Sequence, residues 1–230
     1  MVRIIETYGQ MLTVAMGHTL LLALWGLLFG CILGIVFGLM SVVDNKISRT
    51  VSAIYVNLIR GVPMIVLAYF VYFGFPLLWN NILNLDSLWG VKLVLSPLTA
   101  GTICLALNCG AYMSEIIRAG IQAIDPGQME AARSLGLSYW RSMFRVVLPQ
   151  AIKNMIPSIV NQFIITLKDT SILSVIGFPE LVNTAKNVVA STFLSFQTWG
   201  IVAVMYLVVI LALQQVAKFT ERRLNRDRQK

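Results

Sequence analysis

Hydrophobic residues along this chain occur in long runs, and short polar or basic segments separate the runs. From Thr7 through Val43 the sequence contains no Asp, Glu, Lys or Arg. An α-helix needs about 20 residues to cross the hydrocarbon core of a bilayer, so this run is long enough to span a membrane. The same pattern predicts helical spans near residues 17–43, 51–78, 93–117, 151–176 and 196–219. We therefore expect an all-α polytopic membrane protein with about five transmembrane helices.

The composition supports this fold class. Of the 230 residues, 57% are hydrophobic and only 12% are charged, about half the charged fraction of a soluble domain. The first hydrophobic run is longer than that of a signal peptide, and Glu6 partly offsets Arg3, so we expect a retained anchor. Residues 1–230 are expected to form a single transmembrane domain surrounded by membrane lipid.

The basic residues decide how the chain is oriented. The formal net charge is +8, but the charges fall between hydrophobic runs, so we expect no nucleic-acid partner. They gather in the first connection, the third connection and the tail: Lys46, Arg49, Arg118, Arg133, Arg141, Arg145, Lys153, Lys218, Arg222, Arg223, Arg226, Arg228 and Lys230. Because basic connections remain in the cytoplasm, the pattern predicts an outer N-terminus and a cytoplasmic C-terminus.

No residues suggest a metal site, a cofactor or catalysis. Cys31, Cys104 and Cys109 form no CxxC pair, and His18 is the only histidine. We therefore expect a transporter or channel rather than an enzyme. In the first span Gly26, Gly30, Gly34 and Gly38 recur every four residues, and the side of the helix that they form admits close approach of another helix. That helix can belong to the same chain or to a second subunit.

The segment 119–149 is more polar and predicts two short helices. Asp125 is placed to cap the first helix, and Gly136 suits the left-handed position that ends it. Ser138 can cap a second helix that runs to about Val147.

Helical spacing places side chains of this second helix along two separate stripes. Tyr139, Met143 and Val147 share one stripe, and Arg141 and Arg145 share another. We expect an amphipathic docking element on the cytoplasmic side.

The sequence Glu130-Ala131-Ala132, followed by Gly136 and Leu148-Pro149, resembles the EAA loop of bacterial ABC-importer permeases. Further segments resemble the polar-amino-acid branch of that family, which serves histidine, glutamine and arginine: Arg60-Gly61-Val62-Pro63, Ala111-Tyr112-Met113-Ser114-Glu115, Arg118-Ala119-Gly120 and Lys168-Asp169-Thr170-Ser171. The resemblance covers most of the chain. It implies the permease subunit of an ATP-driven amino-acid importer in the bacterial cytoplasmic (inner) membrane.

The resemblance also implies partners. The loop would seat in a cytoplasmic ATPase subunit, a second permease chain would complete the membrane domain, and an outer solute-binding protein would deliver the amino acid. No GxxxxGK[ST] phosphate-binding sequence is present, so ATP hydrolysis is expected in the partner. The expected coupling residues are Glu130, Ala131, Ala132, Gly136, Tyr139, Arg141, Met143 and Arg145. Two alternatives remain open: a loop lying on the membrane surface, and an ATPase-independent channel or ion-coupled carrier for small polar solutes.

Charged and polar residues inside the spans are candidates for substrate contact. An unpaired charge at the centre of a membrane helix costs about 2.5 to 3.5 kcal/mol, so such residues should face water, protein or each other. Gln162 and Asp169, seven residues apart on nearly the same helix face, are the leading pair. The remaining candidates are Asn161, Lys168, Thr170 and Ser171, followed by Asn108, Ser114 and Glu115 as weaker ones.

The competing interpretation is that Lys168 and Asp169 only brace neighbouring spans. Gln162 is a neutral amide, which favours polar uncharged amino acids such as glutamine over basic ones.

Overall fold

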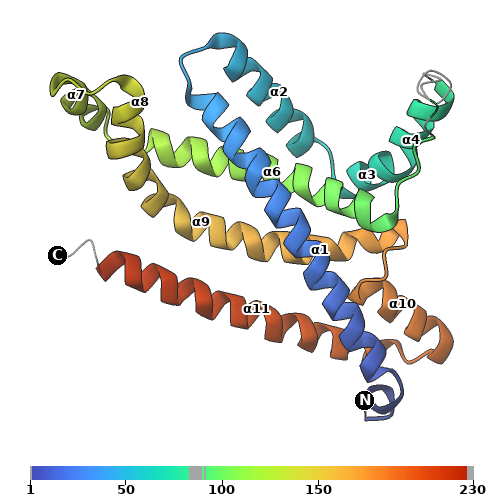
Figure 1. Ribbon diagram of the computed structural model, residues 1–230. Helices are drawn as coiled ribbons and strands as arrows, with labels where there is room; N and C mark the ends of the chain where they lie inside the picture. Colours follow the sequence, from blue (N-terminus) through green and yellow to red (C-terminus); the bar gives the residue numbers. More distant parts are fainter. Residues whose placement is uncertain (1, 83–89, 91, 227–230) are drawn as a thin grey trace.

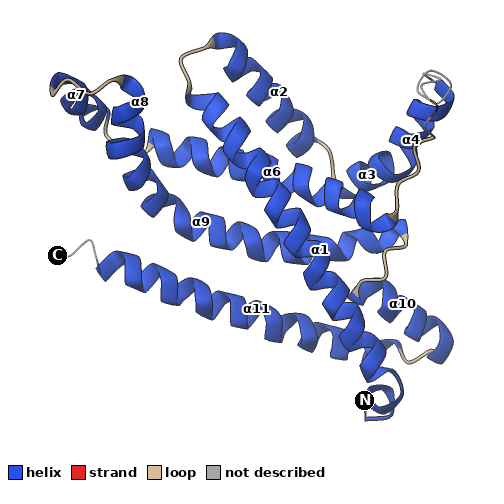
Figure 2. Cartoon of the chain, viewed as in Figure 1, coloured by secondary structure: helices blue, strands red, loops and turns tan. Residues whose placement is uncertain are grey.

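The computed structural model describes residues 2–82, 90 and 92–226, and every regular element of these residues is a helix (Figure 2). Five helical segments of this described part are long and apolar enough to cross a membrane: Ile4–Val42, Met64–Ile82, Pro97–Gln122, Tyr139–Ile176 and Ser195–Val216. The expected fold class is confirmed. The side chains of Arg3 and of the basic residues after Lys218 lie outside the described part.

Figure 1 shows the order of the helices along the chain. The first half contains α1 (Val2–Val42), α2 (Lys46–Gly61), α3 (Met64–Tyr69), the π-helical η1 (Phe70–Gly74), α4 (Phe75–Leu77), the π-helical η2 (Leu78–Ile82) and α6 (Pro97–Gln122). The second half contains α7 (Pro126–Ser134), α8 (Tyr139–Ser142), the π-helical η3 (Met143–Val147), α9 (Leu148–Asp169), the 3-10 helix η4 (Thr170–Ile176), α10 (Leu181–Thr192) and α11 (Ser195–Arg226).

The second membrane segment differs from the expected range of 51–78. Val62 has φ −107° and ψ 132°, which ends α2 at Gly61, because a residue that precedes proline is disfavoured in the helical region. The helix resumes at Met64 after Pro63, and the segment with membrane-spanning length is Met64–Ile82. The expected range therefore joined the end of one helix to the start of another.

Helix α2 packs against both α1 and α6. The Asn45 side chain begins the helix by accepting a hydrogen bond from the Ile47 amide at 2.9 Å. Ser52 Oγ donates to the Phe37 carbonyl of α1 at 2.7 Å, and Tyr55 Oη donates to the Leu107 carbonyl of α6 at 2.9 Å. These two bonds fix the position of α2 over the α1–α6 pair.

The glycine side of α1 contacts α6 within the same chain. A Cβ atom added at Gly26 would lie 2.5 Å from Leu105 Cβ, and one added at Gly34 would lie 2.5 Å from Met113 Cβ. Gly30 and Gly38 meet Cys109 and Ile117 in the same way. Of the two possibilities left open by the sequence, the structure shows packing inside the subunit.

The polar connections gather at two opposite ends of the molecule. In Figure 1, α7, α8 and the end of α11 lie at one end, which we call the α7–α8 end, whereas the N-terminus and α10 lie at the other. The exposed residues Arg133, Arg141 and Arg145 belong to the α7–α8 end. The basic third connection and the start of the tail therefore share one side of the helix bundle.

Glu180 fixes helix α10 at the opposite end. Its side chain is 0% exposed and accepts hydrogen bonds from the amides of Val182 and Asn183 at 2.8 and 2.6 Å. Tyr206 Oη of α11 donates to the same carboxylate at 3.4 Å. Burial raises the pKa of Glu180 from 4.5 to about 7, and the hydrogen bonds oppose only part of that rise.

Candidate functional site

Three segments meet at Asn108, near the middle of α6. Asn108 is 9% exposed, and its Nδ2 donates to Asp169 Oδ2 at the end of α9 at 3.2 Å. The same nitrogen lies 3.7 Å from Sδ of Met64, the first residue of α3. The restart of the helix after Pro63, the middle of α6 and the end of α9 therefore converge on one polar group.

The helix changes type directly after Asp169. The segment Thr170–Ile176 is a 3-10 helix, which is tighter than an α-helix and leaves different carbonyls to be satisfied. Thr170 Oγ1 donates to the Leu167 carbonyl and Ser171 Oγ donates to the Lys168 carbonyl, both at 2.7 Å. The two hydroxyls that were candidates for substrate contact bond the backbone at this transition.

The leading pair from the sequence is not joined by a hydrogen bond among the described contacts. Gln162 is 3% exposed, and its Nε2 donates to Thr166 Oγ1 one turn further along α9 at 3.4 Å. Asp169 bonds Asn108. Sequence spacing placed Gln162 and Asp169 on one helix face, but it could not show which partner α6 would present.

A polar stripe runs along α9 away from Asp169. Asn154, Ser158, Asn161 and Lys168 are exposed and recur at helical spacing. A helix facing lipid tails would not carry such a stripe, because polar groups in the hydrocarbon need water or protein partners. We therefore infer that this face of α9 is directed toward water or another protein chain and not toward lipid.

A charged cluster joins α2 and α6 nearer the α7–α8 end. Arg118 Nε and Nη2 donate to the two carboxylate oxygens of Glu115 at 3.1 and 2.7 Å, and Arg118 Nη1 donates to Gln122 at 2.9 Å. Arg60 Nη1 of α2 lies 3.6 Å from Glu115 Oε2, and the Arg60 guanidinium lies 4.9 Å from the centre of the Tyr112 ring. The cluster ties together three of the segments that resemble the permease family.

A further candidate, Ser114, is 1% exposed, and its hydroxyl has no hydrogen-bond partner among the described residues. It lies on α6 beside Glu115 but is closed off from the surface in this chain. The sequence named Ser114 and Glu115 together as weaker candidates on the third span, whereas the structure distinguishes a buried hydroxyl from a half-exposed carboxylate.

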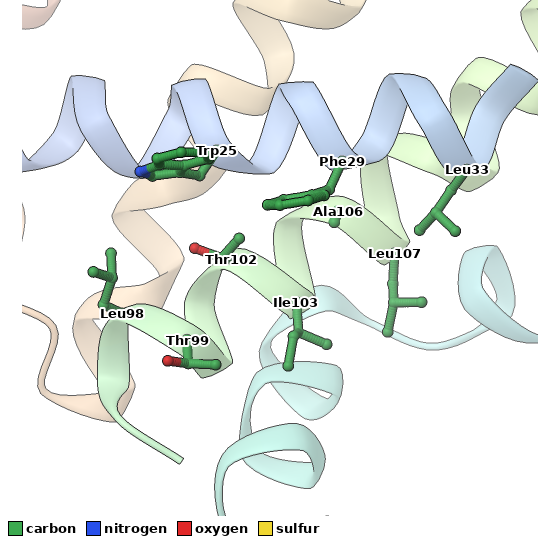
Figure 3. Close-up of a pocket in the computed structure, with 9 residues that line it drawn as sticks. All are labelled: Trp25, Phe29, Leu33, Leu98, Thr99, Thr102, Ile103, Ala106 and Leu107. Carbon is green, nitrogen blue, oxygen red and sulfur yellow. The ribbon is translucent and has the colours of Figure 1, made fainter.

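A cavity of about 560 Å³ between α1 and α6 is chemically unsuited to a zwitterion. Figure 3 shows Trp25, Phe29 and Leu33 of α1 facing residues of α6, and the polar groups of the lining are the indole of Trp25 and the hydroxyls of Thr99 and Thr102. It offers no charged partner for an ammonium or a carboxylate, so we assign it no part in substrate contact.

The two-helix segment predicted between residues 119 and 149 is present. Asp125 Oδ1 accepts a hydrogen bond from the Gly127 amide at 2.7 Å and caps α7. Gly136 has φ +84°, and the Leu137 amide donates to the Ala132 carbonyl at 3.2 Å, which closes the helix in a Schellman motif. Ser138 occupies the cap position of α8 without a side-chain cap bond.

The second helix continues beyond its expected end near Val147. Residues 143–147 form a π-helical turn that leads directly into α9. A proline clashes with the carbonyl four residues before it in a regular α-helix, and the wider turn lies immediately before Pro149. Helix α8 is thereby continuous with α9, which carries the polar stripe.

The predicted coupling residues divide between an inner and an outer side. Ala132 and Met143 are 5% and 6% exposed and Tyr139 is half-buried. The exposed members are Glu130, Ala131, Gly136, Arg141 and Arg145. The outer side offers small residues together with charges of both signs to a partner.

Comparison with known proteins decides the family. The family model described as binding-protein-dependent transport system inner membrane component matches residues 26–226. The chain belongs to this family. It is therefore a multi-pass inner membrane permease component, and ATP hydrolysis belongs to a separate subunit of the transport system.

Several relatives carry more specific names. The glutamine transport system permease protein GlnP of Escherichia coli strain K12 is 35% identical over 206 residues, covering 90% of this permease and 89% of the relative. The arginine transport system permease protein ArtQ of Bacillus subtilis strain 168 is 36% identical over 206 residues, covering 90% and 89%. These matches confirm the resemblance to ABC-importer permeases and set aside the ATPase-independent channel or carrier.

Solved structures agree with the fold. A crystal structure of an amino acid ABC transporter with histidines contains a chain that is 36% identical to this permease, with a TM-score of 0.83 and coverage of 95% and 96%. A chain of the MetNI methionine ABC transporter in an inward-facing conformation is 20% identical, with a TM-score of 0.76 and coverage of 95% and 98%. The second likeness concerns the fold alone.

Proposed function

We propose that a polar amino acid crosses the membrane beside Asn108 and Asp169, at the junction of α6, α9 and the start of α3. The chain is the permease subunit of an ATP-driven amino-acid importer, as its family and its glutamine and arginine relatives indicate. The observation that carries the proposal is the 3.2 Å hydrogen bond from Asn108 to Asp169, which pairs an amide with a half-buried carboxylate where the helix changes type. Transporters commonly place such changes beside the substrate.

The polar groups at this junction match the two ends of an amino acid. Asp169 can accept hydrogen bonds from the ammonium group, and the exposed Lys168 and Asn161 can donate to the carboxylate. A zwitterion that leaves water needs such replacements on both ends. Gln162 and Thr170 are buried and already bonded, so their contact with substrate requires a rearrangement of α9 and stays a prediction.

The substrate we propose is a polar uncharged amino acid such as glutamine. Lys168 and Asp169 are adjacent charges of opposite sign, which suits a substrate whose own charges cancel. The glutamine permease of Escherichia coli among the relatives supports this choice. Competition of labelled glutamine uptake by a panel of amino acids tests it, and preferential competition by arginine or histidine would contradict it.

The contact proposal is tested by Asp169→Asn and Asn108→Ala in the assembled transporter with its binding protein. A hydrogen bond to a charged group contributes about 1.5 to 3 kcal/mol, so we expect the KM for uptake to rise by roughly ten- to a hundredfold. Asp44→Asn is the matched control, because Asp44 is an exposed carboxylate whose partner among the described residues is Arg49 of α2. Unchanged uptake in both junction variants would overturn the contact proposal.

We also propose how the chain is assembled and oriented. The exposed outer side of α7 and α8, including Glu130 and Arg141, docks on an ATPase subunit in the cytoplasm. The polar stripe of α9 faces a water-filled path completed by a second permease chain, identical or related. The α10 end receives a solute-binding protein outside the membrane. In this orientation the N-terminus is outside and the C-terminus inside, in agreement with the basic residues gathered at the α7–α8 end.

A further inference from the structure

A second polar cavity lies between the Asn108 junction and the α7–α8 end. It has a volume of about 460 Å³ and includes Arg60 of α2, Tyr112 and Glu115 of α6, and Asn154 and Ser158 of α9 in its lining. Tyr112 and Glu115 follow Asn108 by four and seven residues, so they lie about 6 and 10 Å further along the helix axis. The cavity is thus the next polar site along the same two helices.

The charges at this cavity are not balanced once Arg118, which is not a lining residue but contacts the lining residue Glu115, is counted. Glu115 is the one carboxylate among its described lining residues, and two guanidinium groups share it. Arg118 donates hydrogen bonds to both oxygens of this carboxylate, at 3.1 and 2.7 Å, and a third hydrogen bond to Gln122. Arg60 lies 3.6 Å away, too far for a hydrogen bond, and its side chain is 40% exposed. One positive charge therefore remains without a carboxylate of its own.

We propose that this cavity is an exit station, in which Arg60 binds the carboxylate of the amino acid after it has left Asp169. A guanidinium group can hold a carboxylate through two parallel hydrogen bonds, and the incoming anion would balance the excess positive charge. Tyr112 stabilises the guanidinium from one side, at 4.9 Å from the ring centre. The station rests on the proposed amino-acid substrate.

The depth of Arg60 favours an amino acid over a lipid headgroup. Arg60 lies 14 residues after Lys46, the first residue of α2, which is about 21 Å along the helix axis. Glu115 lies seven residues before the end of α6 at Gln122, about 10 Å inside that end. A headgroup at the membrane surface would have to enter the bundle to reach this pair.

The site can be probed with a cysteine placed in its lining. Ser158→Cys is made in the assembled complex with its ATPase, in inside-out vesicles without binding protein, on a Cys31→Ser background because Cys104 and Cys109 are 0% exposed. The rate of reaction with a water-soluble methanethiosulfonate is measured with glutamine and with its α-carboxamide analogue. With glutamine at ten times its Kd, occupancy predicts a slowing of about tenfold, and the analogue should have little effect.

Three variants assign the protection to Arg60. Arg60→Gln should abolish it, Arg60→Lys should retain part of it, and Arg49→Gln should leave it unchanged, because Arg49 lies on the same helix but pairs with Asp44. Co-purification of the ATPase with each variant confirms assembly. Absence of protection, equal protection by the carboxamide, or protection that survives Arg60→Gln would each overturn the proposal.

Three further outcomes identify the occupant of the cavity or distinguish the station from the Asn108–Asp169 contact. A rate that depends on anionic lipid in the vesicle and not on glutamine would identify a headgroup as the occupant and overturn the station. The uptake test of Asp169→Asn is independent of the cysteine measurement. Unchanged uptake with full protection would defeat only the Asn108–Asp169 contact, whereas lost uptake without protection would defeat only the station.

Discussion

The buried carboxyl of Glu180 should make the stability of this permease depend on pH. Glu180 lies between the fourth and fifth candidate spans, where it caps α10 and bonds Tyr206 of α11. Its pKa is about 7 in the folded protein, against 4.5 for an unburied glutamate. The folded state therefore holds a proton that the unfolded chain releases at lower pH.

The sign and size of the effect follow from this difference. As pH rises from 4.5 to about 7, the unfolded chain is ionised while the folded protein keeps its proton, so the free energy of unfolding falls. Each pKa unit corresponds to 1.36 kcal/mol, which gives a loss of roughly 3 kcal/mol over this window. Above pH 7 the contribution of Glu180 is constant.

Glu180→Gln removes the titration but keeps a side-chain oxygen at the start of α10. Weakening the cap should cost about 1 kcal/mol at all pH values, so the variant should be less stable than the original at pH 5. At pH 8 the order should reverse, because the variant has no charge to bury. Plots of melting temperature against pH for the two proteins should therefore cross between pH 5 and pH 8.

The assay is thermal unfolding of the purified transporter in detergent at pH 5, 6, 7 and 8. Glu6→Gln is the matched control, because Glu6 is an exposed carboxyl near the same end of the molecule, and its melting temperatures should follow those of the original at every pH. If the melting temperatures of the original protein and of Glu180→Gln changed in parallel with pH, the assignment of a buried protonated carboxyl would be refuted.

Three further predictions address the packing of α1 on α6 and the α7–α8 segment that contains the predicted coupling residues. Gly34→Val should lower stability by about 1 to 3 kcal/mol, measured as resistance to denaturation, because its Cβ would lie 2.5 Å from Met113 Cβ; Gly17→Val, with nothing within 4 Å of its Cβ, should not. Glu130→Lys should abolish uptake while membrane insertion and unfolding temperature stay normal, and normal uptake would contradict the coupling role. Gly136→Val should lose ATPase co-purification, because φ +84° strains a branched side chain by about 1 to 3 kcal/mol.

Local sequence signals were sufficient wherever the deciding physics is local. The length of the charge-free runs required membrane helices, and Asp125 and Gly136 predicted the start and end of α7 because a cap and a left-handed residue depend on only a few neighbours. The glycine repeat of α1 predicted a close contact with another helix but could not say which helix it was. The segment resembling an EAA loop indicated the family from local sequence alone.

Tertiary structure decided which distant groups meet. Helical spacing paired Gln162 with Asp169, but α6 brings Asn108 to Asp169 and leaves Gln162 bonded to Thr166. The approach of Arg60 to the Glu115–Arg118 pair of α6 likewise depends on how α2 lies across α6. A sequence sets the period of one helix, whereas the partner of a polar side chain in a membrane depends on the approach and rotation of a second helix, which the packing of all the spans determines together.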